Sequence, residues 1–150
     1  MSAIVNHLLA LVGDWRGTET IESTPWGAGG PAMSQITAKA GCGGRVLIQD
    51  YSAERDDKVW LQAHAVFHFD AARDAYQLFW FDSLGFVPAQ PAEGTWNAGV
   101  LSFVRTSARG HTRHVYTQVS DDEYRMQLDT SFDGGASWLP VMAGLYTRST

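Results

Sequence analysis

The sequence predicts an all-β protein, a single up-and-down antiparallel barrel of about 8–10 strands preceded by a short N-terminal helix. After residue 13, apolar and polar residues alternate with a period of two over most of the chain, which is typical of half-buried strands. Short turns rich in glycine, aspartate and asparagine divide these strands at regular intervals, with almost no helical periodicity between them. Tight turns join strands that are neighbours in the sheet, so we expect up-and-down order in one domain, residues 1–150.

The predicted helix spans residues 3–11. Its apolar residues Ile4, Val5, Leu8 and Leu9 recur at helical spacing. Gly13 follows where a helix commonly ends in the left-handed conformation.

The candidate strands follow this helix to the end of the chain. They span 15–22, 32–40, 44–53, 58–69, 75–83, 92–97, 99–106, 111–119, 123–132 and 137–148. The loops and turns predicted between them include 25–31, 41–44, 70–74, 97–99, 107–110, 120–122 and 133–135.

The composition excludes several classes of protein. A formal charge of −5 argues against a nucleic-acid partner, because phosphate binding needs a basic face, and equally against an anionic membrane surface. The N-terminus lacks the features of a signal peptide, so we expect a cytoplasmic protein. The single cysteine, Cys42, excludes an internal disulfide and a cysteine-based zinc site, and no motif predicts a cofactor.

The interior is expected to be aromatic or hollow. Charged residues make up 18 %, below the usual quarter, while the chain has six Trp, seven Phe and five Tyr. In strand 123–132 the inner face is expected to carry Tyr124, Met126, Leu128, Thr130 and Phe132.

Strand 58–69 has an unusual pattern. Its odd positions are wholly apolar from Val59 to Phe69, but its even positions mix Trp60 and Val66 with polar residues. Three interpretations stay open: a strand covered on both faces, a homodimer interface, or a cavity wall with polar and aromatic side chains.

Several stretches resemble one bacterial lipocalin-like (calycin-type) β-barrel family of unknown function. The stretches are Gly13-Asp14-Trp15, 43–51, 63–65, 69–70, 76–83, 94–96, 133–138 and Gly144 to Arg148. The resemblance implies a barrel whose first-strand Trp15 packs against Arg148 from the end of the chain, and it implies no activity. Where the family often has glycine on both sides of the histidine, this chain has Ala63 and Ala65, which narrows the space beside His64.

His64 and His68 cannot share a metal ion on a strand, because residues four apart lie about 13 Å from one another. We expect each to be a hydrogen-bonded histidine of the barrel wall.

The relation of His64 to Asp82 depends on the register of the hairpin 58–83. If Asp70 pairs with Ala75, Ala63 faces Asp82 and Ala65 faces Trp80, which places small residues against large ones. If Asp70 pairs instead with Tyr76, His64 faces Asp82 and forms a pair able to tune a general base. We favour the first register.

Two further groups concern the interior. Glu19 shares a face with Trp15, so it is expected inside, where a carboxylate needs a partner. In the hairpin 99–119 we expect His114 and Tyr116 to belong to a solvated basic rim, the alternative being that their polar ends point into a cavity.

These observations favour a barrel that binds a small, largely apolar molecule inside. The expected ligand-binding residues are Glu19, His64, Trp80, Asp82, Tyr116 and Met126. The alternatives are an enzyme (a hydrolase or isomerase) with a His64/Asp82 pair, a haem-binding barrel of nitrobindin type with one axial histidine, and a structural or dimer-forming protein.

Overall fold

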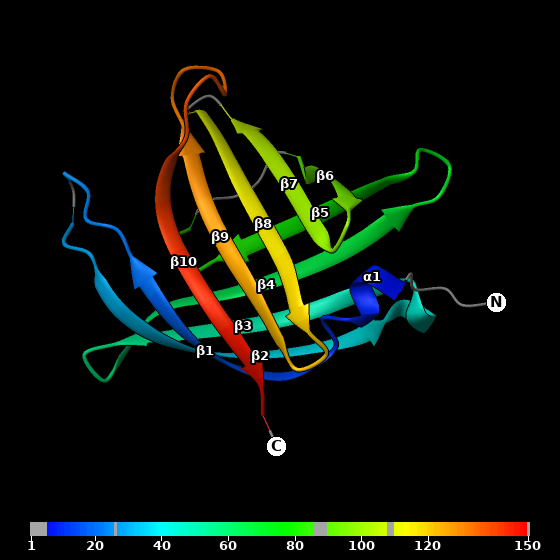
Figure 1. Ribbon diagram of the computed structural model, residues 1–150, viewed down its shortest axis with the longest axis horizontal. Coiled ribbons are helices and arrows are strands. Elements are labelled where there is room, and N and C mark those ends of the chain that lie inside the picture. The colour runs from blue at the N-terminus through cyan, green and yellow to red at the C-terminus, as the bar shows by residue number, and fades with distance from the viewer. Residues whose placement is uncertain (1–5, 26, 86–89, 108–109, 150) are drawn as a thin grey trace.

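The chain forms one closed antiparallel barrel of ten strands in the computed structural model (Figure 1). The structure describes residues 6–25, 27–85, 90–107 and 110–149. Each strand pairs with its neighbours in sequence, and the first pairs with the last, so the order around the barrel is up-and-down. The predicted fold class is confirmed.

The elements follow the predicted order. They are α1 (Asn6–Leu9), β1 (Gly13–Ile21), β2 (Gly30–Gly41), the 3-10 turn η1 (Cys42–Gly44), β3 (Val46–Arg55), β4 (Lys58–Asp70), β5 (Ala75–Asp82), β6 (Ala92–Asn97), β7 (Val100–Ser107), β8 (Gly110–Ser120), β9 (Glu123–Ser131) and β10 (Leu139–Arg148). Residues 3–5 of the predicted helix, residue 26 of the loop 25–31 and residues 108–109 of the turn 107–110 lie outside the described residues.

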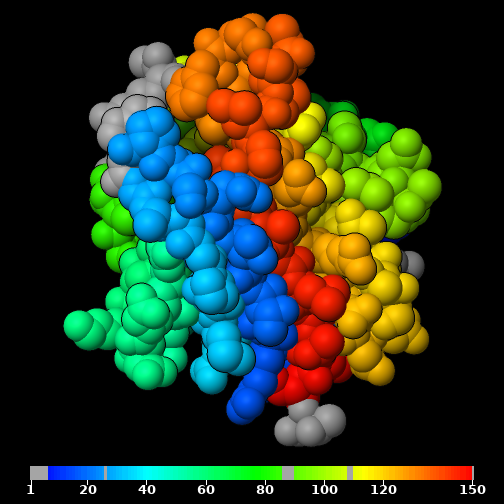
Figure 2. Space-filling model, turned by 60° about the vertical axis from the view of Figure 1, so that its left-hand side comes forward, coloured from blue at the N-terminus to red at the C-terminus, as the bar shows by residue number. Residues whose placement is uncertain are grey.

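The barrel closes where β1 meets β10, which lie side by side in Figure 2 (blue and red). Trp15 pairs with Arg148, and the guanidinium carbon of Arg148 lies 4.2 Å from the centre of the Trp15 ring. Arg148 Nη1 also donates to the carbonyl of Val12 at 2.6 Å, and Trp15 Nε1 donates to the carbonyl of Leu11 at 3.0 Å. The expected contact between the two ends of the chain is confirmed.

Helix α1 closes the end of the barrel at which Trp15 contacts Arg148, and we call this end the foot. It lies away from the β9–β10 loop, drawn in orange in Figure 1. Leu8 and Leu11 are buried in the core next to Trp15, whereas Leu9 points outward. The His7 ring stacks on Trp96 with 3.7 Å between ring centres. The foot is therefore filled by side chains.

Aromatic rings fill the middle of the barrel. Tyr124 packs edge-on against Trp15 at 4.7 Å and stacks on Tyr146 at 5.0 Å. Gly17 makes room for this layer, since a Cβ atom there would overlap the Tyr146 ring and the Ser34 hydroxyl. A side chain at position 17 would push Tyr146 out of its place.

Phe132, expected on an inner face, and Val59, from the wholly apolar side of strand 58–69, both lie outside. Phe132 is exposed because β9 ends at Ser131 and the chain turns away after it. Val59 is exposed because the register of β4 shifts next to it. On the outer face of β4, Val66 pairs with Ile48 and Phe79, which explains its apolar character without a cavity.

Among the described residues, no helix is long and apolar enough to cross a membrane.

Candidate ligand-binding site

A hollow of about 140 Å³ lies at the end of the barrel away from the foot. The ends of β1, β3, β5, β7 and β9 and the beginnings of β4, β8 and β10 surround it. The lining residues are Ile21, Tyr51, Trp60, Leu61, Trp80, Asp82, Leu84, Arg105, Thr112, His114, Met126, Leu128, Val141 and Met142. Ten of these fourteen side chains are aliphatic, thioether or aromatic, so the hollow favours an apolar body.

Aromatic rings form one wall of the hollow. The centre of the Trp80 ring lies 5.3 Å from that of His114 and 6.0 Å from that of Tyr51. Trp80 fits because its cross-strand partner is Ala65, a small residue on the same inner face. Flat rings at these distances provide contact area with little side-chain freedom to lose.

Two β-bulges add side chains that strict alternation would not place there. The register of β4 shifts between the partners of Ala53 and Glu54, which leaves Trp60 as the extra residue, and that of β10 shifts between Pro140 and Met142, which leaves Val141. Both extra residues line the hollow. Bulges redirect side chains in this way at barrel rims and binding sites.

The carboxylate of Asp82 has local partners. Its Oδ2 accepts from Trp80 Nε1 at 2.9 Å, and its Oδ1 accepts from the backbone N–H of Leu84 at 3.0 Å. Asp82 therefore orients the Trp80 ring and holds the chain that leaves β5.

His114 is buried and neutral. Burial, and secondarily the positive charge of Arg105, lowers its pKa from 6.5 to about 3. Its Nδ1 has no hydrogen-bond partner among the described residues, and neither has Trp60 Nε1. A buried polar atom without a partner costs about 1–3 kcal/mol, so a bound molecule or water that reached these atoms would be stabilised.

A polar layer lies below the hollow. Glu19, which is 3 % exposed, accepts hydrogen bonds from the Tyr51 hydroxyl, 2.7 Å from each carboxylate oxygen, and from Tyr146. Burial, and then the negative charge of Glu19, raises the pKa of Tyr51 far above its usual value. The buried carboxylate of Glu19 was expected to have a partner, and the structure supplies two tyrosine hydroxyls.

Tyr116 lies between this layer and the hollow. It shares a small void of about 10 Å³ with Trp80, Met126 and other residues. Its hydroxyl has no hydrogen-bond partner among the described residues, nor has that of Tyr124. Burial raises the pKa of Tyr116 above 10, so its hydroxyl stays protonated and can donate.

The structure thus brings together five of the six expected binding residues. Trp80, Asp82 and Met126 line the hollow, Tyr116 lies beneath it, and Glu19 holds Tyr51, which is one of its walls. The expectation that His114 and Tyr116 belong to a solvated rim is wrong, because the alternation of β8 turns both inward against Leu101 and Phe103.

His64 does not line the interior. Asp70 pairs with Ala75, the register that we favoured, so His64 faces Phe81 and Ala63 faces Asp82. Successive side chains on a strand point to opposite faces, and His64 therefore lies outside the barrel. The His64/Asp82 catalytic pair does not exist.

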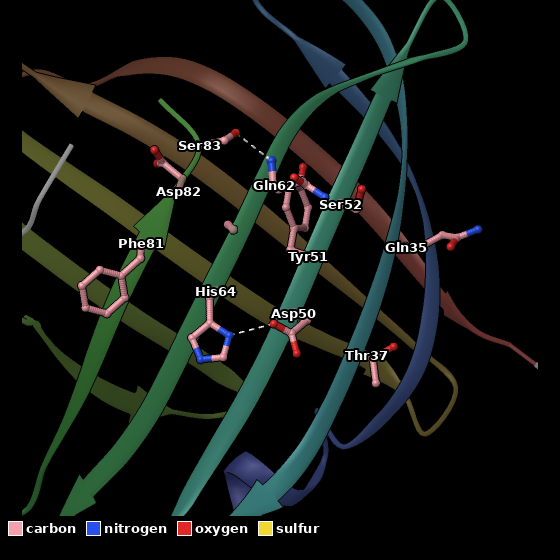
Figure 3. A pocket seen from close by; sticks show the side chains of 11 residues that line it. Gln35, Thr37, Asp50, Tyr51, Ser52, Gln62, His64, Phe81, Asp82 and Ser83 are labelled. Carbon is pink, nitrogen blue, oxygen red and sulfur yellow. Dashed lines mark hydrogen bonds and ion pairs between the residues drawn. The ribbon is translucent and has the colours of Figure 1, made fainter. Parts of the chain in front are cut away.

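His64 instead pairs with Asp50 on the outer face of β3 and β4, with 2.7 Å between His64 Nδ1 and Asp50 Oδ1 (Figure 3). The two side chains lie in a shallow concavity of about 540 Å³ beside Phe81. His68 has a separate partner, Gln77, at 3.2 Å, as expected for two independent wall histidines. Within the described ranges, no three His, Cys, Asp or Glu side chains group as metal ligands.

Sequence reasoning missed Trp60, Arg105 and Val141 as lining residues. Arg105 has a signal in the sequence, because alternation in β7 places it on the same face as Leu101 and Phe103. Trp60 gave only the unusual pattern of strand 58–69, for which a cavity wall was one open interpretation. Val141 gave no signal, since a bulge shifts the alternation of its strand without a mark in the sequence.

One protein family matches nearly the whole chain. The model of the family described as "Protein of unknown function (DUF1579)" matches residues 3–148. No curated protein matches.

Three solved structures show how widely this barrel occurs. Rv2717c from M. tuberculosis is 15 % identical, with a TM-score of 0.72 over 98 % of this chain and 99 % of its own. The S-type phycobiliprotein lyase CPES from Guillardia theta is 11 % identical, with a TM-score of 0.70 over 95 % of this chain and 90 % of its own. A DUF3598-family protein of unknown function from Nostoc punctiforme is 12 % identical, with a TM-score of 0.63 over 95 % of this chain and 49 % of its own. At these identities the similarity shows the shared fold.

Proposed function

This chain belongs to the DUF1579 family, whose description assigns no activity, and we propose a function from its geometry. The barrel binds one small, largely apolar molecule in the hollow at the end away from the foot. The observation that carries the proposal is an apolar and aromatic hollow inside an otherwise filled barrel. Barrel mouths with apolar walls and a few polar groups are common ligand sites.

The volume sets the size of the ligand. An engineered protein cavity of about 150 Å³ takes up benzene, and the hollow here measures about 140 Å³. We therefore expect a ligand with a single ring or a short aliphatic chain.

A haem-binding barrel fits this geometry less well. Of the histidines in the described ranges, only His114 lines the hollow. Pockets for drug-sized ligands measure roughly 300–1,000 Å³, so a macrocycle would need strands to move apart. An absorption spectrum after haem addition tests this alternative, and a shifted haem band that disappears in His114→Phe would support it.

The proposal is tested by filling the hollow. Val141→Trp places a large ring in it, whereas Leu139→Trp, two residues away on the same strand and 56 % exposed, leaves it empty. We expect calorimetry with benzyl alcohol to give a Kd between about 1 µM and 1 mM for the wild type and Leu139→Trp. Val141→Trp should bind at least tenfold more weakly.

Circular dichroism checks that both variants fold. Equal affinity in Val141→Trp and the wild type would place the bound probe elsewhere and contradict the proposal. No binding of any single-ring compound to the wild type would contradict it as well.

A further inference from the structure

Arg105 is a cation beside an apolar hollow, and the described residues supply no partner for its charge. It is partly buried, lies opposite Thr112 in the β7–β8 ladder, and lines the hollow together with Thr112. No hydrogen bond or ion pair joins its guanidinium to any residue in the part of the chain that the structure describes.

The other partly buried arginines in the described part of the chain, Arg55, Arg113 and Arg148, do have partners, and so has the exposed Arg73. Arg73 binds Glu93 at 2.9 Å, Arg113 binds Asp129 at 3.0 Å, and Arg148 binds the carbonyls of Val12 and Asp121. Even Arg55 donates to the carbonyl of Ala28 at 3.0 Å. In a chain with 16 acidic and 11 basic residues, a partner for Arg105 would be easy to supply.

The titratable groups that face the hollow, within the described ranges, do not compensate the charge of Arg105. Asp82 from β5, the carboxylate among the described residues that line the hollow, forms no ion pair with Arg105 and already accepts from Trp80 and Leu84. From β8, His114 is neutral, and the charge of Arg105 contributes to keeping it so. Tyr51 from β3 is protonated.

A guanidinium at the edge of an apolar space costs solvation energy that an anion would restore. Its planar donors match a carboxylate in two parallel hydrogen bonds, which are stronger than bonds between neutral groups. The remaining buried donors near the hollow, Trp60 Nε1 and the Tyr116 hydroxyl, also favour an acceptor-rich ligand.

We infer that the ligand of the hollow is a small monocarboxylate, with its ring or short chain among Trp80, Met126 and Leu128 and its carboxylate on Arg105. This inference rests on the proposed function and specifies the chemical class of the ligand. Arg105 determines specificity by charge, and the apolar walls limit the size of the ligand.

Three probes of nearly equal size test the inference by calorimetry: benzoate, benzyl alcohol and benzylamine. We expect the wild type to bind benzoate at least tenfold more tightly than benzyl alcohol, and benzylamine most weakly. Arg105→Gln should weaken benzoate binding by 10–100-fold and change benzyl alcohol binding by less than threefold. The matched control is Arg125→Gln, an exposed arginine of β9, which should bind all three probes like the wild type.

The outcomes separate the inference from the proposed function. Equal binding of benzoate and benzyl alcohol, unchanged in Arg105→Gln, overturns the inference and leaves the proposed function standing. Tightest binding of benzylamine also overturns it and assigns the polar contact to Asp82. If no probe binds to folded wild-type protein, both fall. Arg105→Lys, which keeps the charge but not the planar donors, should retain part of the benzoate affinity.

Discussion

The buried histidine of the hollow makes the stability of the protein depend on pH. His114 has a pKa of about 3 in the folded protein and 6.5 when unperturbed, so between these values the unfolded chain binds a proton that the folded one does not. The free energy of unfolding therefore decreases as the pH falls below about 6.5, by up to about 1.4 kcal/mol per pH unit from this group.

We expect His114→Phe to remove this contribution. Urea unfolding of the wild type and the variant at pH 7, 6, 5 and 4 measures it, because the difference between the two proteins should change steadily in favour of the variant as the pH falls. A difference that is constant with pH would show that His114 is protonated equally in both states.

The carboxylate of Glu19 accepts from two buried tyrosine hydroxyls, and the other acceptor of Tyr51 among the described residues is the weak thioether sulfur of Met142 at 3.9 Å. Replacing Glu19 by alanine removes the carboxylate acceptor of both hydroxyls, at about 1–3 kcal/mol each. We expect Glu19→Ala to lower the free energy of unfolding by about 3 kcal/mol or more. Glu19→Gln, which keeps one acceptor and the shape, should lose less, and equal losses in the two variants would contradict this account.

Helix α1 closes the foot of the barrel with its buried side chains. Leu8 is 1 % exposed and packs in the core, so Leu8→Ala should cost about 2–5 kcal/mol through lost contacts and a cavity. Leu9, on the same helix and 41 % exposed, is the matched control, and Leu9→Ala should change stability by less than about 0.5 kcal/mol. Chemical unfolding measures both, and similar values would mean that α1 is not docked.

The hairpin of β4 and β5 shows what an element's register decides. The small residues Ala63 and Ala65 opposite Asp82 and Trp80 predicted the correct pairing from packing alone. Strict alternation of inward and outward side chains did not predict the position of Trp60, because the bulge that turns this ring inward depends on the pairing of β3 with β4. A bulge depends on two paired strands, so the sequence of one strand alone does not predict it.

In the molecule as a whole, the pairing of β1 with β10 closes the barrel. Arg148 contacts the Trp15 ring and two backbone carbonyls, so we expect Arg148→Ala to lower the free energy of unfolding by about 2 kcal/mol or more. Arg125→Ala, which removes an exposed arginine of β9, should be close to neutral. Thermal and urea unfolding compare the two, and equal stability would contradict a role of Arg148 in closure.

A homodimer was one interpretation of the apolar residues on both faces of β4, and it stays a prediction. The outer row of Ile48, Val66 and Phe79 is partly exposed and would be its contact surface. Light scattering at high protein concentration measures it, and a monomer there would contradict it.

The sequence by itself determined the order of the strands and the inward face of Glu19 and Met126, and its resemblance to lipocalin-like barrels implied the contact of Trp15 with Arg148. It could do so because alternation and turns are local signals, and a closed up-and-down barrel follows from them with little choice. The tertiary structure alone decided that the hairpin of β4 and β5 turns Trp80 inward and His64 outward, and that His114 lies inside. It also decided that two bulges and Arg105, which has no partner among the described residues, complete the hollow. These features depend on how one strand is aligned with the next and on which charges find partners across the barrel, which are relations between distant parts of the chain.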